Sequence, residues 1–449
     1  MVNVLSRGIL WAAGAALFFS ATVIAKEIPA SKPERQGYSS DRLQRITDHM
    51  NAKVADGTMV GGMGVIARNG KVIYQQTYGM ADRETGREMT DDAIYRIYSM
   101  SKPITAVALM MLYEQGKFRL NDPIAMYLPE MANLQVALST AGTQMISDGT
   151  QSRTIGQGDK SLVGQTRAPS RQPTVRDLLT HTAGLTYGVF GNTEVDQLYR
   201  KAGILGDVSL AEFTQALGQI PLQYDPGSQW HYSVSVDVQG RLVEVLSGMS
   251  FGEFLKTQLF MPLDMPDTDF QINDSNKDRL AQLYKPAGVQ ADNFFSPGTG
   301  DGLEVADAFV SMRYVNGGKF ESGGGGLVST ARDYLRFSQM LLNGGALDGV
   351  RILSPKTIEL MTANHLGELP MGFRGRGAGF GLGFGLVLNP GEVGEVSSAG
   401  EYNWGGAAGT RFWIDPQENL IGIFMVQSIP HRTRLAGDFK VLTYQALVE

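Results

Sequence analysis

Strand-like patterns lie at the two ends of this chain, and helix-like patterns fill the stretch between them. Near the N-terminus, the turn sequence Asn69-Gly70 separates the apolar runs 64–67 and 72–74, which is a strong hairpin signal. Near the C-terminus, three further runs have the pattern of strands: residues 382–388, 409–414 and 420–427. The simplest fold is therefore an α/β arrangement in which one antiparallel sheet is built from both ends and is flanked by helices.

Helical periodicity predicts the elements that cover this sheet. A helix over residues 40–55 places four apolar side chains on one face, those of Leu43, Ile46, Met50 and Val54. A helix over residues 103–115 has a proline in its first turn and is stopped by Gly116. Further helices are expected at residues 209–218, 235–247, 251–260 and 331–342.

The length of 449 residues allows two or three domains. We expect an α/β domain formed by residues 26–120 and 301–449. Residues 121–300 form the mainly helical insertion, with a polar, irregular surface excursion near residues 139–173.

The N-terminus is typical of a secretory signal peptide. Arg7 precedes an uncharged run over residues 8–25, and Val23-Ile24-Ala25 before Lys26 fits a small-residue cleavage site. We expect cleavage after Ala25 and a periplasmic or secreted protein, with no stable membrane insertion after the signal is removed. An uncleaved anchor is the alternative, since about 18 apolar residues are just enough to span a bilayer.

Composition excludes several classes of function. The net charge of −6 argues against a nucleic-acid partner, which normally meets a basic surface. The absence of cysteine excludes disulfides, thiol catalysis and cysteine–zinc sites. The five histidines form no tight ligand pair, so no metal site is expected.

One candidate nucleophile is Ser99, in the sequence Ser99-Met100-Ser101-Lys102. Residues i and i+3 of a helical turn share a face, so Lys102 can reach the hydroxyl of Ser99. The positive end of the helix dipole favours an alkoxide and disfavours a protonated lysine, which makes Lys102 a candidate base. The alternative is that a serine caps the helix and that Lys102 is solvated.

A second candidate is Ser250, in the G-x-S-x-G sequence 248–252. A nucleophile elbow needs a strand before the serine, but a helix is expected there. Glu253 follows three residues after Ser250, which is the spacing of a capping box. We therefore interpret Ser250 as the cap of the next helix.

Two further segments offer partners for a nucleophile. A cation at Lys102 would stabilise the anion of Tyr232 and let it act as a base, although a core tyrosine is the alternative. Gly405 and Gly406 let a ligand approach the backbone, so that an N–H group there can pair with the N–H of Ser99 as an oxyanion hole. A β-bulge is the alternative at the two glycines.

Together these motifs resemble the class C β-lactamase and penicillin-binding protein superfamily of serine hydrolases, and within it the family VIII carboxylesterases. Residues 99–102 match S-x-x-K, Tyr232-Ser233-Val234 stands at the Y-x-N or Y-S-x motif, and Trp404-Gly405-Gly406 stands at the K-T-G or W-x-G motif. Three more segments are similar to the family: residues 174–185, 224–227 and 325–330. The resemblance covers roughly residues 35–449 and implies a β-lactamase-like fold.

The resemblance implies a serine carboxylesterase that acts on small, short-chain esters through an acyl-enzyme, without a cofactor. Ser99 would be the nucleophile, with Lys102 and Tyr232 as its base system. The backbone N–H groups of Ser99 and Ala407 would bind the oxyanion. The substrate would contact Trp404, Gly405, Gly406 and Val234.

Two departures from the family pattern affect the expected substrate. Val234 replaces an amide side chain, and Trp404 replaces the lysine that attracts a β-lactam carboxylate. An indole there predicts a preference for neutral esters. A β-lactamase or D-Ala-D-Ala peptidase is the alternative, and weak β-lactamase activity is compatible with the motifs. A non-catalytic cell-wall or partner-binding protein is a further alternative, against which the set Ser99, Lys102 and Tyr232 argues. The oligomeric state is not specified by the sequence.

Two other features receive structural interpretations. His181 follows a buried-looking helix and is interpreted as a structural histidine rather than a triad member. The glycines at 323–326 lack the Lys-Ser/Thr pair of a phosphate loop, so no such loop is expected.

Overall fold

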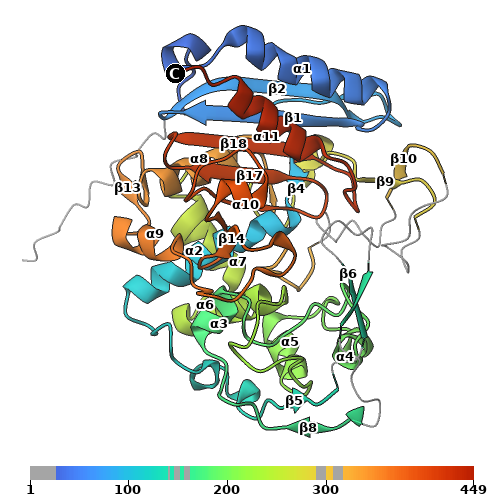
Figure 1. The fold of residues 1–449 in the computed structure, drawn as a ribbon, viewed down its shortest axis with the longest axis vertical. Helices are drawn as coiled ribbons and strands as arrows, with labels where there is room; N and C mark the ends of the chain where they lie inside the picture. The colour runs from blue at the N-terminus through green and yellow to red at the C-terminus, as the bar shows by residue number, and fades with distance from the viewer. Residues whose placement is uncertain (1–26, 140–141, 146–151, 156–161, 290–299, 307–316) are drawn as a thin grey trace, which may run out of the picture.

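The main sheet takes its strands from both ends of the chain (Figure 1). The computed structural model describes residues 27–139, 142–145, 152–155, 162–289, 300–306 and 317–449. The strands of the sheet are β1 Gly61–Arg68, β2 Lys71–Asp82, β3 Arg87–Glu88, β14 Ala378–Phe380, β15 Gly385–Val387, β16 Tyr402–Gly405, β17 Arg411–Asp415 and β18 Leu420–Val426. Their order is β14-β15-β16-β17-β18-β1-β2-β3, and every pair is antiparallel. The expected fold class is confirmed.

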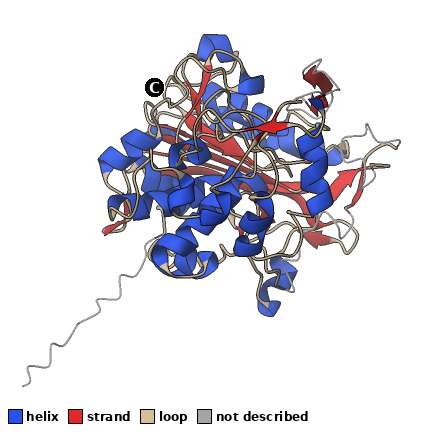
Figure 2. Ribbon diagram, turned by 90° about the horizontal axis from the view of Figure 1, so that it is seen from below, coloured by secondary structure: helices blue, strands red, loops and turns tan. Residues whose placement is uncertain are grey.

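Helices cover both faces of this sheet (Figure 2). Helices α1 (Ser40–Ala55) and α11 (Leu435–Gln445) lie over one face (Figure 1). Ile66 and Phe424 belong to the apolar cluster on that side, whereas their chain neighbours Val65 and Ile423 belong to the larger cluster on the other side. The alternation follows from the two-residue period of a strand, and it explains why β1 and β18 are buried on both faces.

The other face meets α2 (Ser101–Glu114), α8 (Ala331–Leu342) and the helices of the insertion. The remaining helices are α3 Val175–Leu179, α4 Glu194–Ala202, α5 Leu210–Leu217, α6 Ser235–Ser247, α7 Phe251–Leu255, α9 Pro355–Met361 and α10 Pro390–Val393. Short strands form separate pairs: β4 Tyr95–Arg96 with β11 Val328–Ser329, β5 Val136–Ala137 with β8 Thr166–Arg167, β6 Gly142–Met145 with β7 Ser152–Ile155, β9 Tyr284–Pro286 with β10 Leu303–Val305, and β12 Ala346–Leu347 with β13 Val350–Arg351. Helix α2 packs against α6. The domain limits themselves stay predictions.

Several local predictions are confirmed. The hairpin joins β1 to β2, with Asn69 at φ 52° and Gly70 at φ 69°, as a two-residue turn of this sequence requires. The helices expected at 40–55, 235–247 and 331–342 have those bounds in α1, α6 and α8.

Three local predictions need correction. The run 382–388 is a strand only over Gly385–Val387 (β15), because its first residues form a turn with Gly383 at φ 93°, and β14 before that turn was not predicted. The helix expected over 251–260 is α-helical only to Leu255 and continues as a π-helical turn. Helix α2 begins at Ser101 rather than residue 103 and is buried on nearly all sides, since it lies between the sheet and α6.

Some predictions fall outside the described residues. The expected signal peptide and its cleavage after Ala25 lie wholly there, as do parts of the excursion near 139–173. In the part of the chain that the structure describes, no helix has the length and apolar character needed to cross a membrane.

Candidate active site

Ser99 lies in a 3-10 turn, η2 (Tyr98–Met100), directly before α2. Tyr98 has a φ of 44°, which is uncommon for a bulky residue and has to be held by its surroundings. Its side chain packs with Leu283, Ala408 and Ile429. The turn that presents Ser99 is therefore fixed by packing, and the serine itself stays partly exposed.

Lys102 is buried beside the nucleophile, with only 1 % of its surface exposed. Its Nζ donates hydrogen bonds to Ser99 Oγ at 3.1 Å, to the Tyr187 hydroxyl at 2.9 Å and to the Gly324 carbonyl at 2.5 Å. The alternative of a solvated lysine is excluded by this burial. A buried amine needs such partners, because burial without hydrogen bonds is costly.

Tyr232 completes the group at the serine. Its hydroxyl donates to Ser99 Oγ at 2.8 Å, and Lys102 Nζ lies 4.6 Å from the centroid of its ring. Tyr232 precedes α6, and the packing of α6 on α2 brings the two segments together. Lys102 and Tyr232, both predicted from short motifs, thus contact the same atom, Ser99 Oγ.

Two side chains of this centre were missed by the sequence analysis. Tyr187 accepts from Lys102, and burial, followed by the charges of Tyr232 and Asp237, raises its pKa well above the ordinary value, so the phenol stays neutral. Asp237, on α6, is fully buried, and burial raises its pKa. Both are distant in sequence from Lys102, and no short motif marks them.

Asp237 holds the backbone segment that carries one of the acceptors of Lys102. Its Oδ1 accepts from Ser322 Oγ at 2.5 Å and from the N–H of Gly324 at 3.0 Å. A Cβ added at Gly324 would lie 2.7 Å from the Tyr187 hydroxyl and 2.8 Å from Asp237 Oδ2. The glycine run thus allows close backbone approach at this centre.

The predicted oxyanion hole has a suitable backbone. No described residue accepts a hydrogen bond from the N–H of Ser99 or Ala407, and Ala407 is exposed. Gly406, directly after β16, lies so close to the carbonyl of Ile97 that a Cβ would have no room there. The segments that carry Ser99 and Ala407 are therefore packed side by side. The oxyanion-binding role of the two N–H groups stays a prediction.

Trp404 on β16 is 5 % exposed, and its ring centroid lies 5.6 Å from that of Tyr232. Gly405 ends the same strand and is partly exposed. Val234 is fully buried directly before α6. The substrate contacts expected of these residues, and of Gly406, stay predictions.

His181 packs beside the ring of Tyr232 and forms no described contact with Ser99. Its Nδ1 lies 3.3 Å from Ser233 Oγ, and its ring centroid lies 5.0 Å from that of Tyr232. Burial, reinforced by the charges of Lys102 and His231, lowers its pKa well below the ordinary value, so it is neutral. The geometry agrees with a structural histidine.

Ser250 is confirmed as a helix cap. Its Oγ accepts from the N–H of Glu253 at 3.3 Å, and it is exposed at the start of α7. A helix precedes it, as expected.

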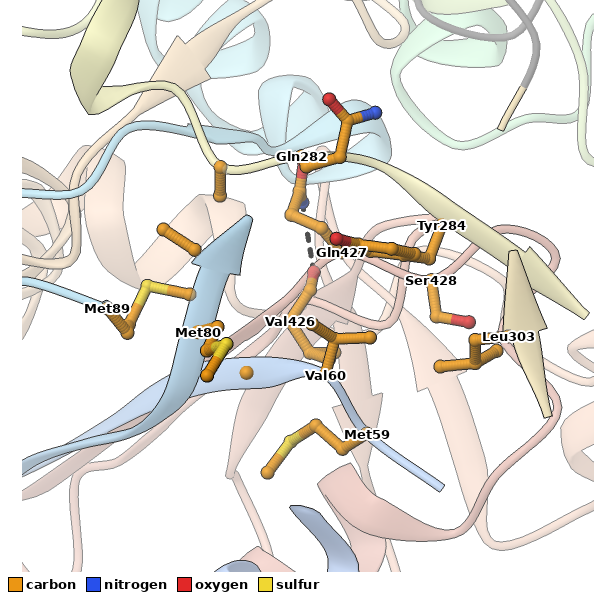
Figure 3. Close-up of a pocket in the computed structure, with 13 residues that line it drawn as sticks. Met59, Val60, Met80, Met89, Gln282, Tyr284, Leu303, Val426, Gln427 and Ser428 are labelled. Carbon is orange, nitrogen blue, oxygen red and sulfur yellow. Dashed lines mark hydrogen bonds between the residues drawn. The ribbon is translucent and has the colours of Figure 1, made fainter. Parts of the chain in front are cut away.

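Two cavities lie elsewhere. One is a pocket of about 10 Å³. Its lining, drawn in Figure 3, includes Met59, Met80, Met89, Tyr284 and Gln427. That volume suits about one water molecule. A larger cavity of about 260 Å³ lies beside charged residues such as Asp267 and Arg332. Ser99, Lys102 and Tyr232 line neither cavity.

Comparisons with known proteins cover nearly the whole chain. The sequence model of the family described as Beta-lactamase matches residues 46–443. Esterase EstB of Burkholderia gladioli is 30 % identical over 80 % of this chain and 83 % of its own length. A putative D-alanyl-D-alanine carboxypeptidase of Escherichia coli K12 is 25 % identical over 92 % of this chain and 89 % of its own length. The solved structure of EstCE1, a hydrolase with promiscuous acyltransferase activity, has a TM-score of 0.68 at 26 % identity and covers 91 % of this chain and 98 % of that one.

Proposed function

Since this chain belongs to the beta-lactamase family and is a serine hydrolase that acts on esters, we propose that it hydrolyses short-chain carboxylic esters through an acyl-enzyme on Ser99. The observation that carries the proposal is the meeting of Lys102 Nζ and the Tyr232 hydroxyl at Ser99 Oγ, at 3.1 and 2.8 Å. A serine that is flanked by two groups able to exchange a proton is an activated nucleophile.

In the first half of the reaction, Ser99 Oγ attacks the ester carbonyl and gives up its proton to the Lys102–Tyr232 pair. The N–H groups of Ser99 and Ala407 stabilise the oxyanion of the tetrahedral intermediate. Tyr232 then returns a proton to the leaving alkoxide as the C–O bond breaks. In the second half, water attacks the acyl-enzyme, the carboxylic acid leaves and the serine hydroxyl is restored. Because Lys102 and Tyr232 both contact Ser99 Oγ, the transferred proton belongs to the pair.

The proposal is tested by p-nitrophenyl butyrate hydrolysis with the mature protein and with the Ser99→Ala and Ser250→Ala variants. We expect Ser99→Ala to lose at least about a thousandfold in kcat, because the nucleophile is removed. Ser250→Ala keeps its activity and loses about 1 kcal/mol of folding free energy, the usual cost of a lost cap.

Loss of activity in Ser250→Ala alone, with Ser99→Ala still active, would contradict the assignment. Mass spectrometry after organophosphate treatment gives an independent measurement, with the adduct expected on the peptide that contains Ser99. A parent protein that neither turns over the ester nor accepts the label would favour a non-catalytic binding protein.

A peptidase or β-lactamase is the second candidate function, favoured by the similarity to the putative carboxypeptidase of Escherichia coli. Nitrocefin turnover separates a β-lactamase from an esterase. We expect its kcat/KM to lie well below that of p-nitrophenyl butyrate, because Val234 replaces the amide side chain of the Y-x-N motif. The reverse order would favour the second candidate.

We also propose export, with cleavage after Ala25. The expected mature protein is recovered from the periplasm or the medium and begins at Lys26 when its N-terminus is sequenced. A chain found in the membrane fraction with residues 1–25 still attached would instead favour the anchor.

A further inference from the structure

A single guanidinium lies over the indole that replaces the family's lysine. Arg374 ends a 3-10 turn, η9 (Gly372–Arg374), in the loop before β14. Its Cζ is 5.2 Å from the centroid of the Trp404 ring, within the range of a cation–π contact. Its Nη1 donates to Asn403 Oδ1 at 2.8 Å. A positive charge therefore lies at the Trp404 position after all, but it is supplied by Arg374 from another part of the chain.

Arg374 has no acidic partner among the described residues: no carboxylate oxygen lies within 4.0 Å of its guanidinium nitrogens. Arg336 shows the contrast, because it is 1 % exposed and pairs with Asp348 at 2.6 Å. A fully buried charge is normally paired in this way, whereas Arg374 is partly exposed and lacks such a partner among the described residues.

The two carboxylates whose charges act on Arg374, those of Glu395 and Glu401, already pair with other cations. Glu401 accepts from Lys440 at 2.8 Å, and Glu395 lies 3.2 Å from Arg411. Burial, with the charge of Arg411, lowers the pKa of Arg374 to about 10, while Glu395, Glu401 and Tyr232 act in the opposite direction. The side chain is therefore still a cation at neutral pH.

A glycine on β15 makes room for this arrangement. Gly385 pairs with Asn403, and a Cβ there would lie 3.1 Å from the Trp404 ring and 3.2 Å from Arg374 Nη1. The guanidinium is thus held by an indole on one side and an amide on the other, while the residue stays partly exposed. An incoming anion would find this cation already positioned.

The guanidinium is one aromatic ring away from the reacting groups. The Trp404 ring centroid lies 5.6 Å from that of Tyr232, whose hydroxyl contacts Ser99 Oγ. A planar guanidinium with unused donors matches a carboxylate better than any other side chain.

We propose that Arg374, packed over Trp404, forms a carboxylate-binding subsite beside Ser99, so that the preferred substrates are esters that carry a carboxylate group, such as half-esters of dicarboxylic acids. This inference rests on the proposed esterase function. It reverses the preference for neutral esters that Trp404 alone predicts.

The test compares matched neutral and anionic esters. The first pair, p-nitrophenyl butyrate and p-nitrophenyl hemiglutarate, places the charge on the acyl side. The second pair, phenyl butyrate and 4-(butyryloxy)benzoate, places it on the alcohol side. For each pair, the ratio of kcat/KM values is measured in the parent protein, in Arg374→Met and in Arg376→Met. Arg376 is the matched control, because it is an exposed arginine of the same loop and no described contact holds its side chain.

We expect the parent to favour the anionic ester of at least one pair, and the preference to weaken with added salt. Arg374→Met lowers that anionic-to-neutral ratio about tenfold, the usual effect of removing a charge-assisted hydrogen bond, whereas Arg376→Met leaves it unchanged. An Arg374→Lys variant recovers part of the ratio.

Ratios that do not depend on residue 374 in either pair would overturn the subsite, as would equal effects of the two arginine variants. The proposed function fails separately, if the parent hydrolyses none of the four esters or if Ser99→Ala keeps its activity. A fold damaged by Arg374→Met is recognised by a lowered Tm together with equal losses on both esters of a pair, while Arg374→Lys still tests the ratio.

Discussion

Three oxygen atoms surround the amine of Lys102, and only one of them belongs to the nucleophile. The other two, on Tyr187 and on the Gly324 backbone, fix the amine in place beside Ser99. Tyr187 stays a neutral phenol because burial raises its pKa. At the scale of single residues, the chemistry therefore depends on a phenol and a backbone carbonyl that never touch the substrate in the proposed mechanism.

A Tyr187→Phe variant measures how much this positioning contributes. We expect kcat for p-nitrophenyl butyrate to fall about tenfold with a smaller change in KM, because one hydrogen bond that orients the amine is removed. Tyr224→Phe is the matched control, since its hydroxyl accepts from Gln223 instead and lies outside the centre. Equal losses in both variants would contradict a positioning role for Tyr187.

Residues that belong to short motifs could be predicted, and residues that act from a distance could not. Ser99 and Lys102 are three positions apart, and a helical turn brings them together. Tyr187 is 85 positions from Lys102, and its hydrogen bond exists only because the insertion folds back onto α2. Arg374 likewise reaches Trp404 through the shape of a loop that no sequence pattern marks.

At the scale of elements, the turns and helices that could be predicted are those stabilised by interactions within their own segment. The Asn69-Gly70 turn and α8 were recognisable, because turn residues and an N-cap with a periodic apolar face lie within the segment. Strand β16 was not among the strands predicted, because its run is only four residues long and ends at the glycines of the site. Strand β14 was not predicted, and the run predicted for β15 began too early, since the turn at Gly383 lies within an apolar run that holds no polar residue.

The glycine segment at 323–326 is the element that joins α6 to Lys102. We expect Gly324→Ala to lose most of the esterase activity, because the added Cβ meets the Tyr187 hydroxyl and Asp237 and displaces a carbonyl that binds Lys102. Gly437→Ala, in α11, is the control. It meets no atom within 4 Å and is expected to stabilise the fold by about 0.5–1 kcal/mol. Kinetics and thermal unfolding of the two variants check this, and an active Gly324→Ala would refute the close packing.

At the scale of the whole molecule, buried titratable groups tie stability to pH. Burial lowers the pKa of both His231 and His431 to about 4, from an ordinary value near 6.5. The unfolded state therefore binds more protons between these values, so each histidine contributes stability above pH 6.5 that is lost as the pH falls towards 4. Asp333 acts oppositely, because burial raises its pKa to about 6.

Urea unfolding at pH 7 and pH 5 tests this dependence. Each histidine is expected to cost about 2 kcal/mol of unfolding free energy at pH 5, and protonation of Asp333 returns about 1 kcal/mol. The net effect is a loss of stability on acidification. A His231→Gln variant is expected to lose less unfolding free energy than the parent between pH 7 and pH 5. An equal or greater loss would contradict the assignment of His231 as a buried neutral group.

The pairing of β1 with β18 joins residues 62–68 to residues 420–426 at the middle of the main sheet. During synthesis the ribosome makes the N-terminal partner first and the C-terminal partner more than 350 positions later. The helices and the Ser99 segment therefore cannot pack against the complete sheet until nearly the whole chain has emerged from the ribosome. A nascent chain of this kind has no hydrolytic centre until its translation is almost complete, and the ribosome sets the earliest moment at which the enzyme can act.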